Sequence, residues 1–222
     1  MKLVTFQTIK AYNELLKNGI LINNHKYIDY EKAGKVYEWV VDEMLKKVPN
    51  KNVKYPLWAW YKYGKIKSPP KHKTYGYFPG NENQIVKITF EKNDNEVFLT
   101  NFNLYSFLLN NRYIPSSKSD NENYLKLLKE YNITEEELKA FVRKDKYKVH
   151  RSDKNYLKII KKNYESFKKI LEPGNDRIQA CIWNLKIEEV ISIEYIDKKT
   201  CIQVKPKNRR SYIKEYLKSL EK

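Results

Sequence analysis

The sequence predicts an α+β protein with a mixed or antiparallel central sheet. Strand-like runs open the chain and return in its middle and near its end, separated by polar, basic helical segments. The regular alternation of strands and helices that typifies a doubly wound sheet is missing. A length of 222 residues suits one domain over 1–222, with a basic helical insertion at about 116–171.

The first fifty residues contain one short strand and two helices. The run "LVTFQT", 3–8, predicts the strand, and the amphipathic run that follows predicts a helix with Thr8 as its N-cap and Gly19 as its stop. The apolar triplet "ILI" then resumes an extended conformation. A second helix is expected over about 30–47, closed by Pro49.

The middle of the chain carries its densest aromatic run, "YPLWAWYKYGKIKSPPKHKTYGY". Within 57–63, the odd-numbered residues would lie on one face of a strand and both tryptophans on the other, so both faces are apolar until Lys62. This predicts a strand covered on both sides, with the tryptophans filling the core. A loop follows from 64. Residues 84–90 and 95–100 are expected to form a hairpin joined near "EKNDN", and 103–113 a short helix.

The pattern changes to polar and helical over 116–171, where Thr134 and Glu137 form a capping-box signature. Strands return in "RIQACIWNLKIEEVISIEYI" and "TCIQVKP", and a basic helix begins at about 209.

The net charge of +17, from 44 Lys and Arg against 27 Asp and Glu, points to an acidic partner. That partner is a nucleic acid, RNA or DNA, or an acidic antitoxin-type protein. An AT-rich genome offers another explanation, because its codon bias also enriches lysine. Residues 141–172 form a second basic surface with eleven Lys or Arg against four Asp or Glu, and "KPKNRRSYIK" forms a third.

The loop after the aromatic strand interleaves lysines with tyrosines, a composition that suits phosphate contacts and base stacking. A solvated lysine loop without a ligand is the alternative. The residues expected to hold a nucleic acid are Lys65, Lys67, Lys71, His72, Lys73, Arg209 and Arg210.

Familiar catalytic signatures are missing, since the chain has no GxxxxGK[ST], GxGxxG, HExxH or GxSxG motif. Its three histidines stand apart from cysteines and carboxylates, so no metal site is expected. Two cysteines are too few for a disulfide scaffold. No signal peptide or membrane-length apolar stretch is seen, and a cytoplasmic location without membrane contact is expected.

The strings "LVTFQTIKAYNELLKNGIL", "YPLWAW" and "IQACIWNLKIEEV" resemble a bacterial family known as domain of unknown function 3841, over nearly the whole chain except 116–171. That family brings no assigned activity. The layout is similar to the ADP-ribosyltransferase superfamily, which implies an ADP-ribosyltransferase-like sheet, NAD as substrate and a nicotinamide stacked on aromatic side chains.

This second resemblance implies a role for several residues. Gln179 stands where the superfamily places its catalytic glutamate and would orient the ribose without supplying its charge. Glu188, or its neighbour Glu189, would supply the carboxylate. Gln7 and Thr8 would hold NAD, and Tyr61 and Tyr63 would flank the nicotinamide.

Three functions follow as hypotheses. The leading one is an NAD-dependent ADP-ribosyltransferase that modifies a nucleic acid, in the manner of bacterial toxins and phage-defence effectors. The second is a non-catalytic nucleic-acid-binding module whose tyrosines stack on single-stranded bases. The third is a toxin-like protein neutralised by an acidic protein partner.

Overall fold

The computed structural model describes residues 1–23, 30–50, 52, 55–63, 84–142, 151–174, 176–197 and 209–221, with the backbone alone for 30–37, 209–212 and 215. It has the predicted α+β composition. Contacts group the chain into two compact units. The sheet unit comprises Met1–Tyr27, Val41–Thr100 and Pro173–Pro206, and the helical unit comprises Ile28–Val40, Asn101–Glu172 and Lys207–Lys222.

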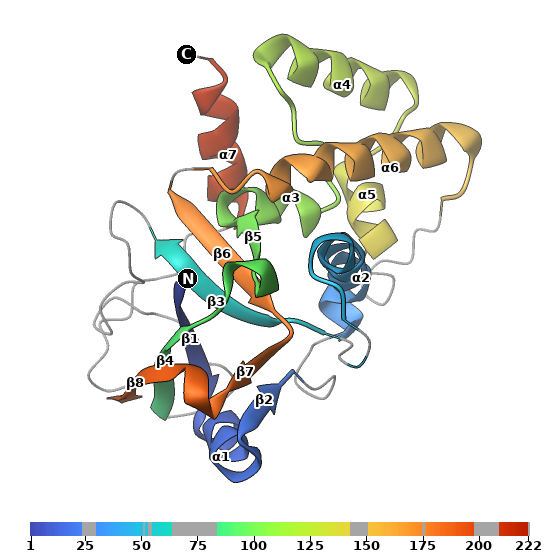
Figure 1. Ribbon diagram of the computed structural model, residues 1–222. Helices are drawn as coiled ribbons and strands as arrows, with labels where there is room; N and C mark the ends of the chain where they lie inside the picture. The colour runs from blue at the N-terminus through green and yellow to red at the C-terminus, as the bar shows by residue number, and fades with distance from the viewer. Residues whose placement is uncertain are drawn as a thin grey trace. The chain divides into compact units, whose positions relative to one another are not determined.

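Within the described ranges, six strands form the main sheet of the sheet unit, in the order β5-β6-β3-β1-β4-β8, and two more form a small sheet, β2-β7 (Figure 1). The pairs β1–β3, β1–β4, β3–β6 and β4–β8 are antiparallel. The strands are β1 (Lys2–Thr8), β2 (Ile20–Ile22), β3 (Leu57–Tyr63), β4 (Gln84–Glu91), β5 (Phe98–Asn101), β6 (Arg177–Ile182), β7 (Asn184–Lys186) and β8 (Val190–Asp197).

Helix α1 (Ile9–Asn18) begins and ends where the sequence predicts. The Thr8 hydroxyl accepts a hydrogen bond from the backbone N–H of Ala11 at 3.0 Å, which satisfies one donor of the first turn. Gly19 adopts a φ of 71° and donates its N–H to the carbonyl of Leu15 at 2.9 Å. A left-handed residue costs glycine little, so the chain can turn sharply into β2.

The core of the sheet unit lies on the sheet face that α1 covers. Alternate residues of a strand point to opposite faces, so each strand contributes every second side chain to this core. Tyr12 and Leu15 of α1 pack there. The buried strand residues of this core are Leu3, Leu21, Leu57, Ala59, Val86, Ile88, Phe90, Ala180, Ile182 and Leu185.

The hairpin expected between 84–90 and 95–100 is wrong. Both strands exist, as β4 and β5, but β4 lies between β1 and β8, whereas β5 lies at the opposite edge beside β6. A short 3-10 turn, η3 (Asp94–Glu96), follows β4 where the hairpin loop was expected. Nearness in sequence favours hairpins, and here pairing with distant strands prevails.

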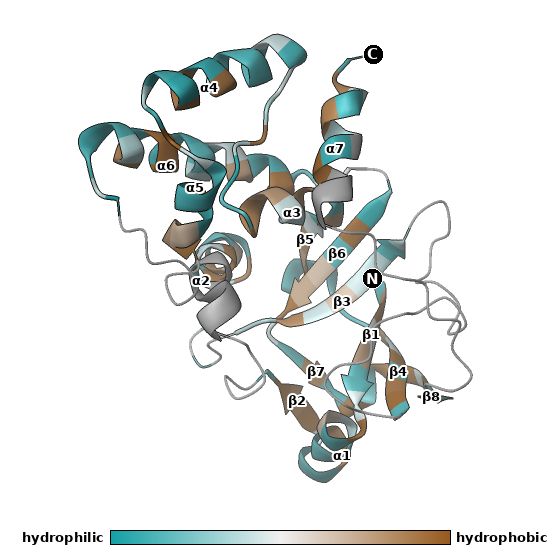
Figure 2. Ribbon diagram, turned by 180° about the vertical axis from the view of Figure 1, so that it is seen from behind, coloured by the Kyte–Doolittle hydropathy of each residue, from teal (hydrophilic) through white to brown (hydrophobic). Residues whose placement is uncertain are grey.

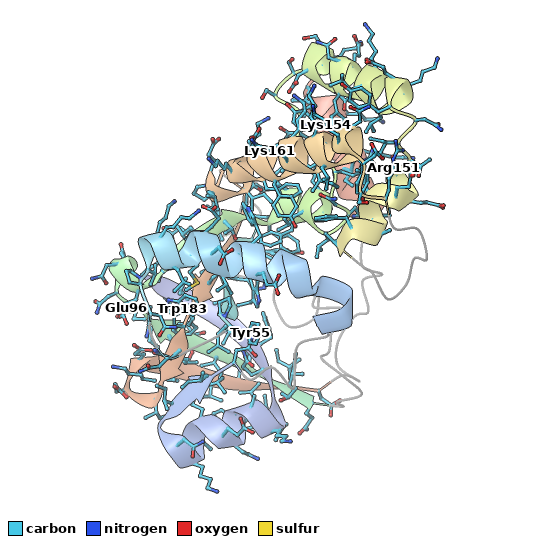
Figure 3. All side chains as sticks on the ribbon, turned by 90° about the vertical axis from the view of Figure 1, so that its right-hand side faces the viewer. Tyr55, Glu96, Arg151, Lys154, Lys161 and Trp183 are labelled. Atoms are coloured by element: carbon cyan, nitrogen blue, oxygen red, sulfur yellow. The ribbon has the colours of Figure 1, made fainter. Side chains whose placement is uncertain are left out.

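Helix α2 (Tyr30–Lys47) has the predicted bounds, and the division between the two units falls within it. In the sheet unit, the chain after this helix is held by the indole of Trp183, which donates a hydrogen bond to the carbonyl of Val48 at 2.7 Å. Figure 3 labels Trp183.

The helical unit confirms the helices predicted within 116–171, and teal, hydrophilic residues predominate along α4 and α6 in Figure 2. The helix expected over 103–113 is shorter. The elements are η4 (Phe102–Leu104), α3 (Tyr105–Leu108), α4 (Lys118–Glu130), α5 (Glu135–Val142), α6 (Lys154–Ser166), η5 (Phe167–Leu171) and α7 (Arg209–Ser219). The apolar sides of α4, α5 and α6 meet in a buried cluster of Tyr124, Leu128, Ile133, Leu138, Tyr156, Ile159 and Ile160.

Side chains cap these helices as the sequence indicates. The backbone N–H of Glu137 donates to the Thr134 hydroxyl at 3.2 Å, and the Glu137 carboxylate accepts the N–H of Thr134 at 2.7 Å, so the predicted capping box is present. At the start of α6, the Asp153 carboxylate accepts the N–H groups of Asn155 and Tyr156, each at 3.1 Å.

Candidate nucleic-acid interface

Trp60, Tyr63, Arg177 and Gln179 lie on one face of the main sheet, where β3 and β6 run side by side (Figure 1). Trp60 pairs with Gln179, and Tyr63 pairs with Arg177. Paired residues of antiparallel strands point to the same face. The rings of Trp60 and Tyr63 meet edge to face at 4.9 Å, and the Arg177 guanidinium lies 5.4 Å from the Tyr63 ring centre. All four side chains are partly exposed. We name this set the aromatic face.

A β-bulge brings Trp60 and Tyr63 together. These residues are three positions apart, so in a regular strand their side chains would point to opposite faces. The pairing with β6 shifts by one residue between Trp60 and Lys62, which leaves Tyr61 as the additional residue. The bulge restores Tyr63 to the face of Trp60.

The opposite face of the same two strands is part of the core. Leu57 and Ala59 of β3, with Ala180 and Ile182 of β6, are buried there. Trp60 was expected to fill the core, but it remains partly exposed on the aromatic face instead. The two faces of this strand pair therefore differ. One is apolar and buried, whereas the other is buried at Cys181 and becomes partly exposed at Trp60, Tyr63, Arg177 and Gln179.

Gln7 and Gln179 do not share a face. Gln7 pairs with Val86, a member of the buried core cluster, so its side chain lies on the α1 side of the sheet. Gln179 pairs with Trp60, which in turn pairs with Val4, three positions before Gln7. Gln7 is three positions after Val4, an odd offset, which places Gln7 on the other face. The two glutamines thus line no common cleft.

Local hydrogen bonds engage both residues expected to hold NAD at the end of β1. The Gln7 amide donates to the Thr5 hydroxyl at 2.8 Å, and that hydroxyl donates to the carbonyl of Trp58 at 2.8 Å. Thr8 caps α1. Both side chains are therefore engaged locally, Gln7 within β1 and Thr8 at the start of α1.

The two acidic residues of the "IEEV" run differ in their surroundings. Glu188 is 67% exposed and forms a surface ion pair with Lys186 at 3.8 Å. Glu189 is 16% exposed and accepts a hydrogen bond at 2.6 Å from the ammonium of Lys92, whose side chain is 1% exposed. The 3-10 turn η6 (Ile187–Glu189) carries both residues, after β7 and not on β6 with Gln179.

The remaining predicted site residues are placed as follows. Tyr61 is 38% exposed at the bulge, and Tyr63 belongs to the aromatic face. Arg209 and Arg210 begin α7, where the structure describes the backbone alone. The residues that lie outside the described part of the chain are Lys65, Lys67, Lys71, His72 and Lys73.

Helix α6 of the helical unit presents a row of three exposed lysines, Lys154, Lys158 and Lys161, two of which are labelled in Figure 3. Their spacing of four and then three residues sets them on one side of the helix. Among the described residues no carboxylate lies within ion-pairing distance of the three ammonium groups, although Glu165 follows one turn later. We name this set the lysine row.

A second group of cations in the helical unit surrounds Tyr113. This ring stacks on Tyr124 at 4.7 Å, and the ammonium groups of Lys162 and Lys169 lie 4.8 Å and 5.6 Å from its centre. Burial, followed by the hydrogen bond to Asp120, raises the pKa of Tyr113 to about 12. Burial also lowers the pKa of Lys169, which donates to Ser116 at 2.6 Å. These lysines are engaged in packing.

Within the described part of the chain, no three His, Cys, Asp or Glu side chains are grouped so that they could hold a metal ion. None of the described helices combines the length and the apolar character needed to span a membrane.

Sequence reasoning missed Arg177. It stands two residues before Gln179 at the start of "RIQACI", so its face could be assigned from the strand alternation. Its contact with Tyr63 could not, because that contact depends on the bulge in β3.

The fold and these two surfaces define an α+β protein with an antiparallel-rich sheet, an exposed aromatic face and a basic helix. A family model described as Domain of unknown function (DUF3841) matches residues 2–191, and the chain belongs to this family. The match runs through 116–171, the segment that we expected to lie outside the resemblance. No curated protein and no solved structure matches the chain.

Proposed function

We propose that this protein binds nucleic acid, and the lysine row of α6 is the observation that carries the proposal. A helix rises by about 1.5 Å per residue, so the Cα atoms of Lys154 and Lys161 are about 10 Å apart along the axis. Three ammonium groups over this length suit consecutive backbone phosphates. Each phosphate that a lysine neutralises releases condensed counterions, which provides affinity without sequence specificity.

The charge of the whole chain supports the same partner. A net charge of +17 steers encounters with polyanions. Some exposed lysines of this chain form ion pairs with nearby acids, as Lys46 does with Glu43 at 2.6 Å. Among the described residues, Lys154, Lys158 and Lys161 form no such ion pair. The ammonium of Lys158 lies at the edge of Tyr131, 3.5 Å from its hydroxyl and 5.9 Å from its ring centre, and the lysine remains exposed.

The NAD-dependent transferase activity stays a prediction that rests on the resemblance in layout. It needs NAD contacts other than the pair Gln7 and Gln179, which lie on opposite faces. It also needs a carboxylate other than Glu189, which Lys92 engages. Nicotinamide release from NAD, measured with and without added RNA or DNA, tests the activity directly.

Fluorescence anisotropy with a labelled oligonucleotide tests the binding proposal. The triple variant Lys154→Gln, Lys158→Gln and Lys161→Gln should bind more weakly than the wild type. Its salt dependence, plotted as log K against log [salt], should be shallower by about 2, from roughly 0.7 per lost contact on a single strand.

A second triple variant supplies the control. Lys2→Gln, Lys17→Gln and Lys47→Gln remove the same charge from exposed positions of the sheet unit, and Lys47, like Lys158, lies near an aromatic ring. If both triples weaken binding equally, the effect is one of net charge and the lysine row is not the interface. If the wild type shows no salt-dependent binding, nucleic acid is not the partner, and an acidic protein becomes the candidate.

A further inference from the structure

The aromatic face differs from an ordinary sheet surface in the chemistry that it gathers. The rings of Trp60 and Tyr63 are in edge-to-face contact, a cation lies against the Tyr63 ring, and a primary amide stands in register with Trp60. All four side chains are partly exposed. Trp60 also has a buried apolar neighbour on this face, Val4 of β1, so the polar members of the set and their exposure are what distinguish the face from core packing.

Each member of this set can contact a different part of a nucleotide. An aromatic ring offers a surface on which a base stacks, whichever base it is. A guanidinium has five N–H donors and binds phosphate oxygens through two of them at once. The amide of Gln179 has both donors and an acceptor, which match the hydrogen-bonding edge of a base.

We propose that the aromatic face binds an unpaired nucleobase, with Trp60 and Tyr63 stacking on it, Arg177 holding the adjoining phosphate and Gln179 contacting its edge. The ligand class is therefore single-stranded nucleic acid. In a duplex both faces of every base are covered by its stacked neighbours, so a sheet-mounted ring has nothing to stack on. The inference rests on the proposed nucleic-acid binding and specifies the form of that ligand.

The position of the bulge supports this assignment. β-Bulges are common next to functional sites, where they redirect a side chain. In β3 the bulge lies between the two rings and is the reason that both are on one face. Without it, Tyr63 would point toward the side occupied by Ala59 and Ala180, and the face would hold one ring.

The test compares a labelled single strand with a duplex of the same sequence. We expect the wild type to bind the single strand at least tenfold more tightly. Tyr63→Leu should lower the single-strand affinity by about tenfold, as expected for one lost stacking contact, and leave duplex affinity within about twofold. Tyr63→Phe should retain the wild-type preference. Arg177→Gln should reduce the salt slope on the single strand by about 0.7.

Tyr195→Leu is the matched control, because Tyr195 is a 60% exposed tyrosine on β8 of the same sheet. Melting temperatures show whether each variant is folded. The inference is overturned if Tyr63→Leu and Tyr195→Leu have the same affinity for the single strand. It is also overturned if neither the wild type nor Tyr63→Leu binds the single strand more tightly than the duplex. In both cases the proposed function stands. If the wild type binds neither ligand in a salt-dependent manner, the proposed function itself fails.

Discussion

The ammonium of Lys92 donates a hydrogen bond to the carboxylate of Glu189 at 2.6 Å, with only 1% of the lysine side chain exposed. The same ammonium donates to Asn184 at 3.0 Å and lies 3.6 Å from the carboxylate of Glu96, which is labelled in Figure 3. The cluster connects the end of β4 with η3, β7 and η6. A buried charge needs such partners, and Glu189 is the carboxylate nearest to Lys92.

Removal of Glu189 should therefore destabilise the protein. We expect Glu189→Ala to lower the free energy of unfolding by about 3 kcal/mol, because the buried ammonium of Lys92 loses its nearest carboxylate and keeps only that of Glu96 at 3.6 Å. Glu188→Ala is the neighbouring control and should change the free energy of unfolding by less than about 0.5 kcal/mol. Urea unfolding measures both. The double variant Lys92→Met, Glu189→Leu should recover most of the lost stability. Equal effects of Glu189→Ala and Glu188→Ala would contradict the assignment.

The bulge in β3 makes a prediction about deletions. Deleting Tyr61 should leave Trp60 opposite Gln179 and Tyr63 opposite Arg177 in a regular register, so the protein should fold and keep single-strand binding. Deleting Ala59 instead shifts Leu57, a residue that is 7% exposed, out of the core. That variant should lose about 2–5 kcal/mol of stability. Denaturant unfolding that ranks the two deletions in the opposite order would refute the register.

Arg151 makes the helical unit sensitive to acid. Its guanidinium donates to the carbonyls of Tyr131 and Asn132 at 2.9 Å and 2.7 Å, and to the carboxylate of Asp153. The hydrogen bond from Arg151 is the main cause that lowers the pKa of Asp153. A lowered pKa adds stability that is present above the ordinary value of 3.8 and is lost as the pH falls through the value in the folded state.

Arg151→Gln should therefore have a lower melting temperature than the wild type at neutral pH. The difference between the two melting temperatures should become smaller in acid. Arg151→Lys should restore little, because an ammonium cannot reproduce the fork of donors. Thermal melts from neutral to strongly acidic pH check this. A wild-type advantage that stays constant down to the lowest pH would show that the Arg151–Asp153 contact does not contribute.

Alkaline pH should destabilise the helical unit through its buried tyrosines. Burial is the largest cause that raises the pKa of Tyr113, Tyr156 and Tyr164, each to about 12. A raised pKa contributes stability that is fully present below the unfolded value of 10.0 and is lost as the pH rises through about 12.

Circular dichroism and tyrosinate absorbance, followed together in a pH titration, measure this effect. Helical signal should fall as these tyrosines ionise, and Tyr113→Phe should shift the loss to higher pH because one ionising group is removed. If every tyrosine ionises near its ordinary pKa and the helical signal does not fall, the prediction is contradicted.

Local features of this protein were readable from the sequence because they depend on neighbouring residues. The cap at Thr8, the left-handed stop at Gly19 and the capping box from Thr134 to Glu137 each involve groups within four positions. Burial patterns along single strands were also partly readable. The hairpin between β4 and β5 was wrong because periodicity identifies a strand without identifying its neighbour.

The sequence by itself determined the α+β class, most helix and strand positions and the basic charge, since these follow from composition, periodicity and capping. Tertiary structure alone decided which side chains share a surface. Gln7 and Gln179 are separated, and Arg177 meets Tyr63, through strand order and one bulge. Side chains alternate with a period of two, so a single additional residue moves a ring from one face to the other, and only the paired strand reveals that residue.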